Sequence, residues 1–159
     1  MLVMSLGQSV CAQTLGKDVS NLLTQLNNKS TKILSMPDSH LMNALLTGVD
    51  FSRYESVNFH KANLSGANFS GANLSGSIRM YMEGSHVEEI NSMNLTATNL
   101  QNATFINANL SNADLRYADL TNANLIGTTL SGTNLGNTKG LSSAQKNYAR
   151  SKGALNVPE

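Results

Sequence analysis

The stretch that decides the fold is residues 108–125, ANLSNADLRYADLTNANL, in which Leu110 is followed by a leucine at every fifth position. The same spacing extends in both directions along the chain. Large apolar residues recur at this five-residue spacing over residues 59–74 and 90–135. We call these fourteen residues the central positions, and all of them are Leu, Phe or Ile. A period of five fits neither an α-helix, which repeats every ~3.6 residues, nor a β-strand, which repeats every ~2. The sequence therefore predicts an internal repeat with a unit of five residues.

The residues around each central position i repeat as well. Position i−2 is Ala in eight of the fourteen units, position i−1 is Asn or Asp in eleven, and position i+2 is Gly or Asn in ten. Residues i and i−2 share one face of a short extended segment, so both can point inward, and Asn and Gly tolerate the corners. We expect each unit to form one short extended side and a turn. Neutral polar side chains then cover the outside, which explains 21 Asn beside only 13% charged residues.

Segments such as residues 62–66 (ANLSG), 108–112 (ANLSN) and 123–125 (ANL) resemble the A(N/D)LXX motif of the pentapeptide-repeat protein family. The resemblance extends over residues 44–141. It implies an all-β solenoid, a right-handed quadrilateral β-helix with about 20 residues in each coil. Its interior would be filled by the central residues, which form the expected structural core: Phe59, Leu64, Phe69, Leu74, Leu95, Leu100, Phe105, Leu110, Leu115, Leu120, Leu125, Leu130 and Leu135.

Stacking at this interval predicts columns of residues. Leu95, Leu115 and Leu135 would form one column, and Asp119 would lie next to Lys139 as a solvent-exposed ion pair of little energetic weight. The column of Asn94, Asp114 and Asn134 would form a hydrogen-bonded ladder on the outside.

Both ends of a solenoid need covering, because terminal coils expose apolar surface and unpaired backbone. In the N-terminal segment, residues 1–43, apolar residues at helical spacing from Val19 to Leu26 follow Asp18, which predicts a short capping helix with an N-cap. In residues 142–159, Ser142 and Gln145 have the spacing of a capping box. We expect a second capping helix there. In the family such a C-terminal segment can also mediate dimerisation, so a monomer and a homodimer both stay open.

The repeat is interrupted near residues 77–89. Ile78 and Met80 can be read as one last degenerate unit, after which the chain forms a projecting loop or a distorted side of the coil. Met and Tyr adapt well to protein contacts, so this segment is a candidate protein-binding tip. The alternative is that its side chains fold back onto the coils. The candidate binding residues are Met80, Tyr81, Met82, Glu83 and His86.

The sequence offers no chemistry for an enzyme. Its three histidines are widely scattered, its glycines recur at corner positions, and its one cysteine, Cys11, can form neither an internal disulfide nor a cysteine metal site. We expect no catalytic residues, no cofactor, no metal and no small-molecule substrate. The net charge of +1 disfavours direct nucleic-acid binding, and no apolar run is long enough to span a membrane.

Two functions are compatible with the repeat. The first is a non-enzymatic scaffold that binds an unidentified protein, through the segment at 77–89 or through Arg116 and Tyr117, which occupy two outward positions of one coil. The alternative comes from the family resemblance: a DNA mimic that binds DNA gyrase or topoisomerase IV and confers quinolone resistance. Over residues 46–141 the sequence carries seven acids and five bases, far short of the one charge per ~1.7 Å of duplex DNA.

The compartment is also open. Leu2, Val3, Met4 and Leu6 are apolar, and Val10 and Ala12 have the spacing of a signal-peptidase site, but no basic residue precedes them. A cytoplasmic protein with an apolar N-terminal cap is slightly favoured over an exported one whose residues 1–12 are the tail of a signal peptide.

Overall fold

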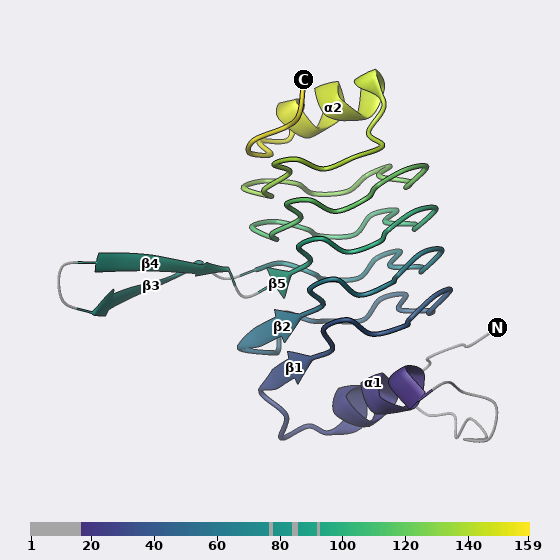
Figure 1. The fold of residues 1–159 in the computed structure, drawn as a ribbon, viewed down its shortest axis with the longest axis vertical. Coiled ribbons are helices and arrows are strands. Elements are labelled where there is room, and N and C mark those ends of the chain that lie inside the picture. Colours follow the sequence, from purple (N-terminus) through teal and green to yellow (C-terminus); the bar gives the residue numbers. More distant parts are fainter. Residues whose placement is uncertain (1–16, 77, 84–85, 92) are drawn as a thin grey trace.

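The computed structural model of the chain describes residues 17–76, 78–83, 86–91 and 93–159; the signal-peptide hypothesis, on residues 1–12, lies outside them. Helix α1 (Lys17–Asn27) lies at one end of a stack of coils and helix α2 (Ser143–Ser151) at the other (Figure 1). Between them are the short strands β1 (Ile33–Ser35), β2 (Ser56–Asn58) and β5 (Met93–Asn94), and the longer β3 (Ile78–Glu83) and β4 (His86–Asn91). None of the helices in these residues is long and apolar enough to span a membrane.

Consecutive coils are joined by parallel backbone pairing. Strands β1, β2 and β5 form a three-stranded parallel sheet, and isolated parallel bridges continue it around the other sides. In the C-terminal half the bridged residues are 20 apart, as in Asn94, Asp114 and Asn134. The Leu95 N–H donates to Asp114 O (2.8 Å), and the Asp114 N–H donates to Met93 O (2.9 Å). Each side of a coil is thus hydrogen-bonded to the coils on both sides of it, as a strand is in a sheet.

The corners are made by two features of the repeat. The side chain at i−1 accepts the backbone N–H two residues later, as in the 3.0 Å bond from Ile126 N–H to Asn124 Oδ1, which closes an Asx turn. The residue at i+2 then has a positive φ, for example 58° at Asn122 and 70° at Gly127. Asn and Gly tolerate this left-handed conformation best, which is why they recur at this position. At Gly127 a Cβ would also overlap the Asn107 Oδ1 of the preceding coil.

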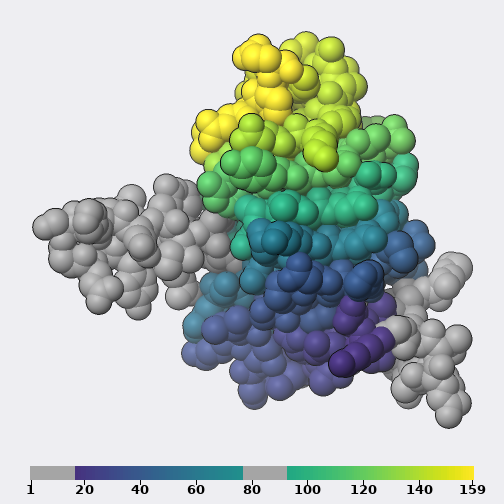
Figure 2. All heavy atoms as spheres, in the orientation of Figure 1, coloured from purple at the N-terminus to yellow at the C-terminus, as the bar shows by residue number. Residues whose placement is uncertain are grey.

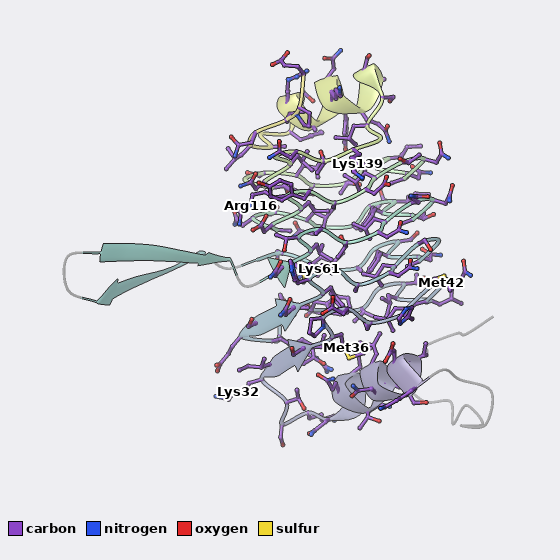
Figure 3. All side chains as sticks on the ribbon, in the orientation of Figure 1. Lys32, Met36, Met42, Lys61, Arg116 and Lys139 are labelled. Carbon is purple, nitrogen blue, oxygen red and sulfur yellow. The ribbon has the colours of Figure 1, made fainter. Side chains whose placement is uncertain are left out.

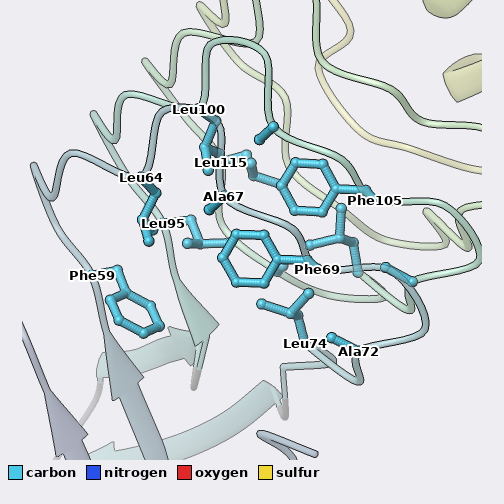
Figure 4. Packing of buried hydrophobic residues seen from close by; sticks show 14 of the residues in the cluster. Phe59, Leu64, Ala67, Phe69, Ala72, Leu74, Leu95, Leu100, Phe105 and Leu115 are labelled. Atoms are coloured by element: carbon cyan, nitrogen blue, oxygen red, sulfur yellow. The ribbon is translucent and has the colours of Figure 1, made fainter. Parts of the chain in front are cut away.

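The core is a set of columns running through the stack. All thirteen central residues from Phe59 to Leu135 that the sequence singles out are buried, together with the Ala residues at i−2. The rings of Phe69 and Phe105 are stacked face to face with centroids 5.1 Å apart, and Leu95 and Leu115 lie in the same interior (Figure 4). Figure 2 shows the coils in close contact along the stack. Large residues at i and small residues at i−2 fill the interior together.

The N-terminal end of the stack is covered by α1. Leu22 and Leu26 are buried against the core. Two backbone N–H groups of the first coil, which have no earlier coil to bond, donate to side chains of this helix: Ser35 to Gln25 Oε1 (3.2 Å) and His40 to Asp18 Oδ2 (2.7 Å). Asp18 therefore lies inside the helix and binds the coil, where the sequence suggested an N-cap.

The C-terminal end is covered by α2 and the residues after it. Ser142 caps this helix, and the reciprocal bonds between Ser142 and Gln145 form the predicted capping box. Three carbonyls of the last coil, which have no later coil to accept from, receive other donors. These bonds run from Gln145 Nε2 to Ala123 O (2.7 Å), from Tyr148 OH to Thr128 O (2.8 Å) and from Leu155 N to Thr133 O (2.8 Å). Side chains and the tail thus replace part of a missing coil.

Three assignments differ from those made from the sequence. The stack includes residues 33–43, assigned above to the N-terminal segment, because β1 is already paired with β2. Ile90, which fits the period of five, lies in β4 opposite Arg79 and is not a coil centre. Ile78 and Met80 likewise belong to β3 and form no degenerate unit. Spacing alone could not separate these residues from true repeats.

Replacing Leu115 by Ala should lower the free energy of unfolding by about 2–5 kcal/mol, because the smaller side chain leaves a cavity in a fully enclosed column. Urea denaturation of the two proteins measures the difference. The matched control is Ile126→Ala, at an exposed position two units later, which should change stability little. Equal effects of the two substitutions would contradict the columnar core.

Replacing Tyr148 by Phe should cost about 1 kcal/mol of stability, because the Thr128 carbonyl loses the hydroxyl that donates to it. Thermal unfolding followed by circular dichroism detects this loss. A Phe variant as stable as the wild type would show that this bond does not help to hold α2 on the last coil.

Candidate protein-binding surfaces

The segment that interrupts the repeat is an antiparallel hairpin. In β3 and β4, Met80 pairs with Glu89, Tyr81 with Glu88, Met82 with Val87 and Glu83 with His86. Figure 1 shows this hairpin standing out from the side of the stack, near the start of β5. Five of the seven candidate binding residues, Met80, Tyr81, Met82, Glu83 and His86, therefore lie on one two-stranded ribbon instead of in a loop or a distorted coil side.

The hairpin is an insertion between two complete repeats. Across it the bridged residues are 36 apart, as in Asn73 and Asn109, against 20 in the later coils, so the segment adds 16 residues. Removing residues 77–92 would place Met93-Asn94-Leu95 directly after Gly76, in phase with Leu74. The ladder continues past the insertion: Phe59 N–H donates to Asn94 O (2.8 Å) and Leu74 N–H to Asn109 O (2.7 Å). The coils therefore do not need the hairpin to keep their register.

The other two candidates, Arg116 and Tyr117, lie on a coil and not on the hairpin. The Arg116 guanidinium binds the Asp114 carboxylate through Nε (2.9 Å to Oδ1) and Nη2 (2.7 Å to Oδ2). This hydrogen bond, with the attraction between the two charges, raises the pKa of Arg116 above its ordinary value. Figure 3 shows Arg116 on the side of the stack from which the hairpin leaves. Its charge is neutralised by its own chain.

Tyr117 occupies a corner position with φ 63°, and its side chain is largely exposed. A bulky residue is unfavourable in this conformation, which most units of the repeat give to Asn or Gly. The sequence shows that Tyr117 departs from the repeat, but only the structure shows that it is held in the left-handed region.

The described residues contain no cluster of His, Cys, Asp or Glu that could hold a metal ion. Asp119 and Lys139 are bridged through their backbones, yet among the described side chains they form no ion pair within 4.0 Å, so that expectation was wrong. The Asp119 carboxylate instead accepts the Thr121 hydroxyl (2.6 Å) and Gln101 Nε2 (2.8 Å). The bond from the Thr121 hydroxyl is the main reason that the pKa of Asp119 lies below its ordinary value.

The expected Asn ladder is only partly present. Asn109 Nδ2 donates to Asn73 Oδ1 (3.3 Å) and Asn73 Nδ2 to Asp50 Oδ1 (3.1 Å). In the column of Asn94, Asp114 and Asn134, the side-chain oxygens accept N–H groups of their own turns. These outer columns close the corners and show no geometry of a binding site.

Comparison with known families gives one match. The family model described as pentapeptide repeats matches in eight copies over residues 55–78 and 94–132, the coils on both sides of the hairpin. No curated protein matches the chain significantly.

Among solved structures, the chain is similar to a pentapeptide repeat protein from the thylakoid lumen of Arabidopsis thaliana, with 22% identity, a TM-score of 0.39, and 72% of this chain and 73% of that one covered. It is also similar to a pentapeptide repeat protein from Nostoc Pcc 7120, with 24% identity and a TM-score of 0.39, and 80% of this chain and 90% of that one are covered. QnrB1, a plasmid-mediated fluoroquinolone resistance protein, matches at 18% and a TM-score of 0.21, over 75% of this chain and 67% of that one.

Replacing Thr121 by Val should raise the pKa of the Asp119 carboxyl toward its ordinary value, because the hydroxyl bond that favours the charged form is lost. Carbon-13 NMR titration of the carboxyl measures the midpoint. Because a lowered folded-state pKa contributes stability that is lost as pH falls through it, the Val variant should also lose less stability on acidification. An unchanged midpoint would contradict the role given to Thr121.

Proposed function

We propose that the chain is a pentapeptide-repeat protein that acts as a non-enzymatic scaffold and binds a protein partner through the β3–β4 hairpin. We infer that the coils are right-handed and four-sided and that the two terminal helices act as caps. Such caps would keep the ends of the stack from pairing with other chains. The coil stack would then serve as a rigid base that presents the hairpin.

The observation that carries the proposal is that 16 residues are inserted between complete repeats without disturbing the ladder. The core does not require them, so their retention calls for another role. A two-stranded hairpin standing alone is at best marginally stable in water and gains stability when it packs against other protein. Among the described residues neither β3 nor β4 pairs with a third strand, so a partner can bind by adding a strand to an outer edge.

The composition of the hairpin indicates the kind of partner. Apolar residues are frequent in it: β3 contains Ile78, Met80, Tyr81 and Met82, and β4 contains Val87 and Ile90. Residues 78–91 contain three acids, Glu83, Glu88 and Glu89, and one base, Arg79, so the hairpin carries a net charge of −2. A partner with an apolar surface bordered by basic residues would complement both features.

The DNA-mimic alternative gains little support from the charges of the coils. A mimic of duplex DNA needs a dense row of unpaired negative charges, about one per 1.7 Å. Here Asp114 is paired with Arg116, and Glu55 is paired with Lys32 (3.0 Å). No described surface offers an acidic row that would favour binding to gyrase.

Deleting residues 77–92 tests the proposal. The variant should unfold cooperatively at nearly the wild-type temperature, because it keeps the ladder and restores a 20-residue coil across the junction. Wild type and variant are then used as baits in lysate, and captured proteins are identified by mass spectrometry. We expect a partner that the wild type retains and the deletion variant loses.

The double substitution Met80→Ser and Met82→Ser, which keeps the hairpin length, should weaken the same capture. Ile126→Asn, on another side of the stack, is the matched control and should bind normally. A partner captured equally by the wild type and the deletion variant would contradict a role for the hairpin and move recognition to the coils.

A further inference from the structure

The first coil is three residues longer than a regular coil. Bridged residues are 23 apart between the first and second coils, as in His40 and Asn63, against 20 in the coils after the hairpin. The extra residues lie between the buried Phe51 and Phe59, which are eight positions apart where the repeat has five. Figure 1 shows α1 lying across the end of the stack that this coil forms. The lengthening therefore occurs on the coil that α1 covers.

Helix α1 has no cap of its own at its C-terminal end. The last four carbonyls of a helix have no partner within it, and a left-handed residue after the helix or a base in its last turn commonly binds them. The last turn of α1 contains no base, and none of residues 27–32 has a positive φ. By contrast, α2 has Arg150 in its last turn, and Gly153 follows it with φ 78°. The C-terminal end of α1 therefore depends on groups from the stack.

The lengthened part of the first coil supplies these groups. Arg53 Nη2 donates to Leu26 O and to the Tyr54 hydroxyl, and this hydroxyl donates to Gln25 O (3.3 Å). The Arg53 guanidinium lies 4.7 Å from the centroid of the Tyr54 ring, and its positive charge is favourable at the C-terminal end of a helix. The Tyr54 ring is buried in the core, whereas Arg53 is exposed. Arg53 can therefore be replaced without changing the core.

The next residue of the same segment holds the start of β1. The Glu55 N–H donates to Lys32 O (2.7 Å), and the Glu55 carboxylate pairs with Lys32 Nζ (3.0 Å). Between α1 and Lys32 lies a short turn, residues 28–31, in which the N–H groups of Ser30 and Thr31 both donate to Asn28. Arg53 and Tyr54 thus bind the helix before this turn, and Glu55 binds the chain after it.

We propose that Arg53 and Tyr54 form a latch that holds α1 on the stack, and that the helix opens as a unit about residues 28–31 while the coils stay folded. Only two residues of α1, Leu22 and Leu26, are buried, and a helix of eleven residues is marginal on its own in water. Opening α1 therefore costs less than unfolding the coils, and the latch sets a large part of that cost.

Opening would change the N-terminal end of the stack from a covered surface to a free edge. In the closed state Gln25 Oε1 accepts the Ser35 N–H (3.2 Å) and Asp18 Oδ2 accepts the His40 N–H (2.7 Å). Both N–H groups lose these acceptors when the helix leaves. An edge with free backbone groups is the kind of surface that pairs with other strands. The latch thus controls whether this edge is exposed.

Native-state hydrogen exchange of the full chain, followed by NMR, tests the latch. In the wild type the amides of residues 21–26 should exchange faster than those of Leu64 and Leu115 in the coils. Arg53→Ala should accelerate residues 21–26 about tenfold, because a hydrogen bond from a charged donor is lost, and should leave both coil amides unchanged. The matched control Lys32→Ala removes the same charge from an exposed ion pair and should leave α1 unchanged.

Tyr54→Phe, which keeps the buried ring and removes the hydroxyl, should also accelerate exchange in α1. The double variant should show less than the product of the two single effects, because Arg53 binds the same hydroxyl. Wild-type exchange of α1 in the Arg53→Ala protein, or acceleration of Leu115 by the same factor as α1, would overturn the proposal. The latch does not involve the hairpin, so its failure leaves the proposed function standing.

Discussion

The backbone hydrogen bonds that join each coil to its neighbours are the constraint on which the rest of the structure depends. Because the Leu115 side is bonded to the coil before it and the coil after it, residues 20 apart must lie in one column. A column buried at one level is buried at all levels, which dictates one large and one small apolar residue in each unit. At the two ends of the stack, backbone N–H and C=O groups have no further coil to bond. Side chains of α1 and α2 form hydrogen bonds with several of these groups. The period of five and the two terminal helices thus follow from one pattern.

The repeat could be predicted from the sequence because its signal is redundant. Leu115 is one of many equivalent positions, and the capping box of Ser142 and Gln145 is a local pattern that needs no knowledge of the fold. The wrong predictions concern residues for which the sequence gives only one indication, without repetition along the chain. Ile90 fits the period by coincidence, and its place in β4 depends on pairing with β3, which a repeat count does not consider. Asp119 and Lys139 are adjacent in their column, but a hydroxyl two residues away is a closer partner for the carboxylate.

The candidate sites are departures from the repeat, and the repeat makes them visible. In a chain where most corners are Asn or Gly, a tyrosine at φ 63° is conspicuous, as is a hairpin inserted between two units that fit together without it. The interruption of the repeat located the hairpin in the sequence, whereas Tyr117 was singled out there only as one of two outward positions of a coil. The sequence could not show that Arg116 lies on the side of the stack from which the hairpin leaves, because that depends on the pairing of Asn94 with Asp114.

The coils on both sides of the hairpin form one ladder that does not depend on it. Native-state hydrogen exchange tests this most directly, because it reports the free energy at which each backbone amide opens. We expect the amides of Leu74, before the insertion, and of Leu95 and Leu115, after it, to exchange through one common unfolding event. The amides of residues 78–83 and 86–91 should exchange at lower free energy. Separate opening of the coils before and after the insertion, or a hairpin as protected as the ladder, would contradict the claim.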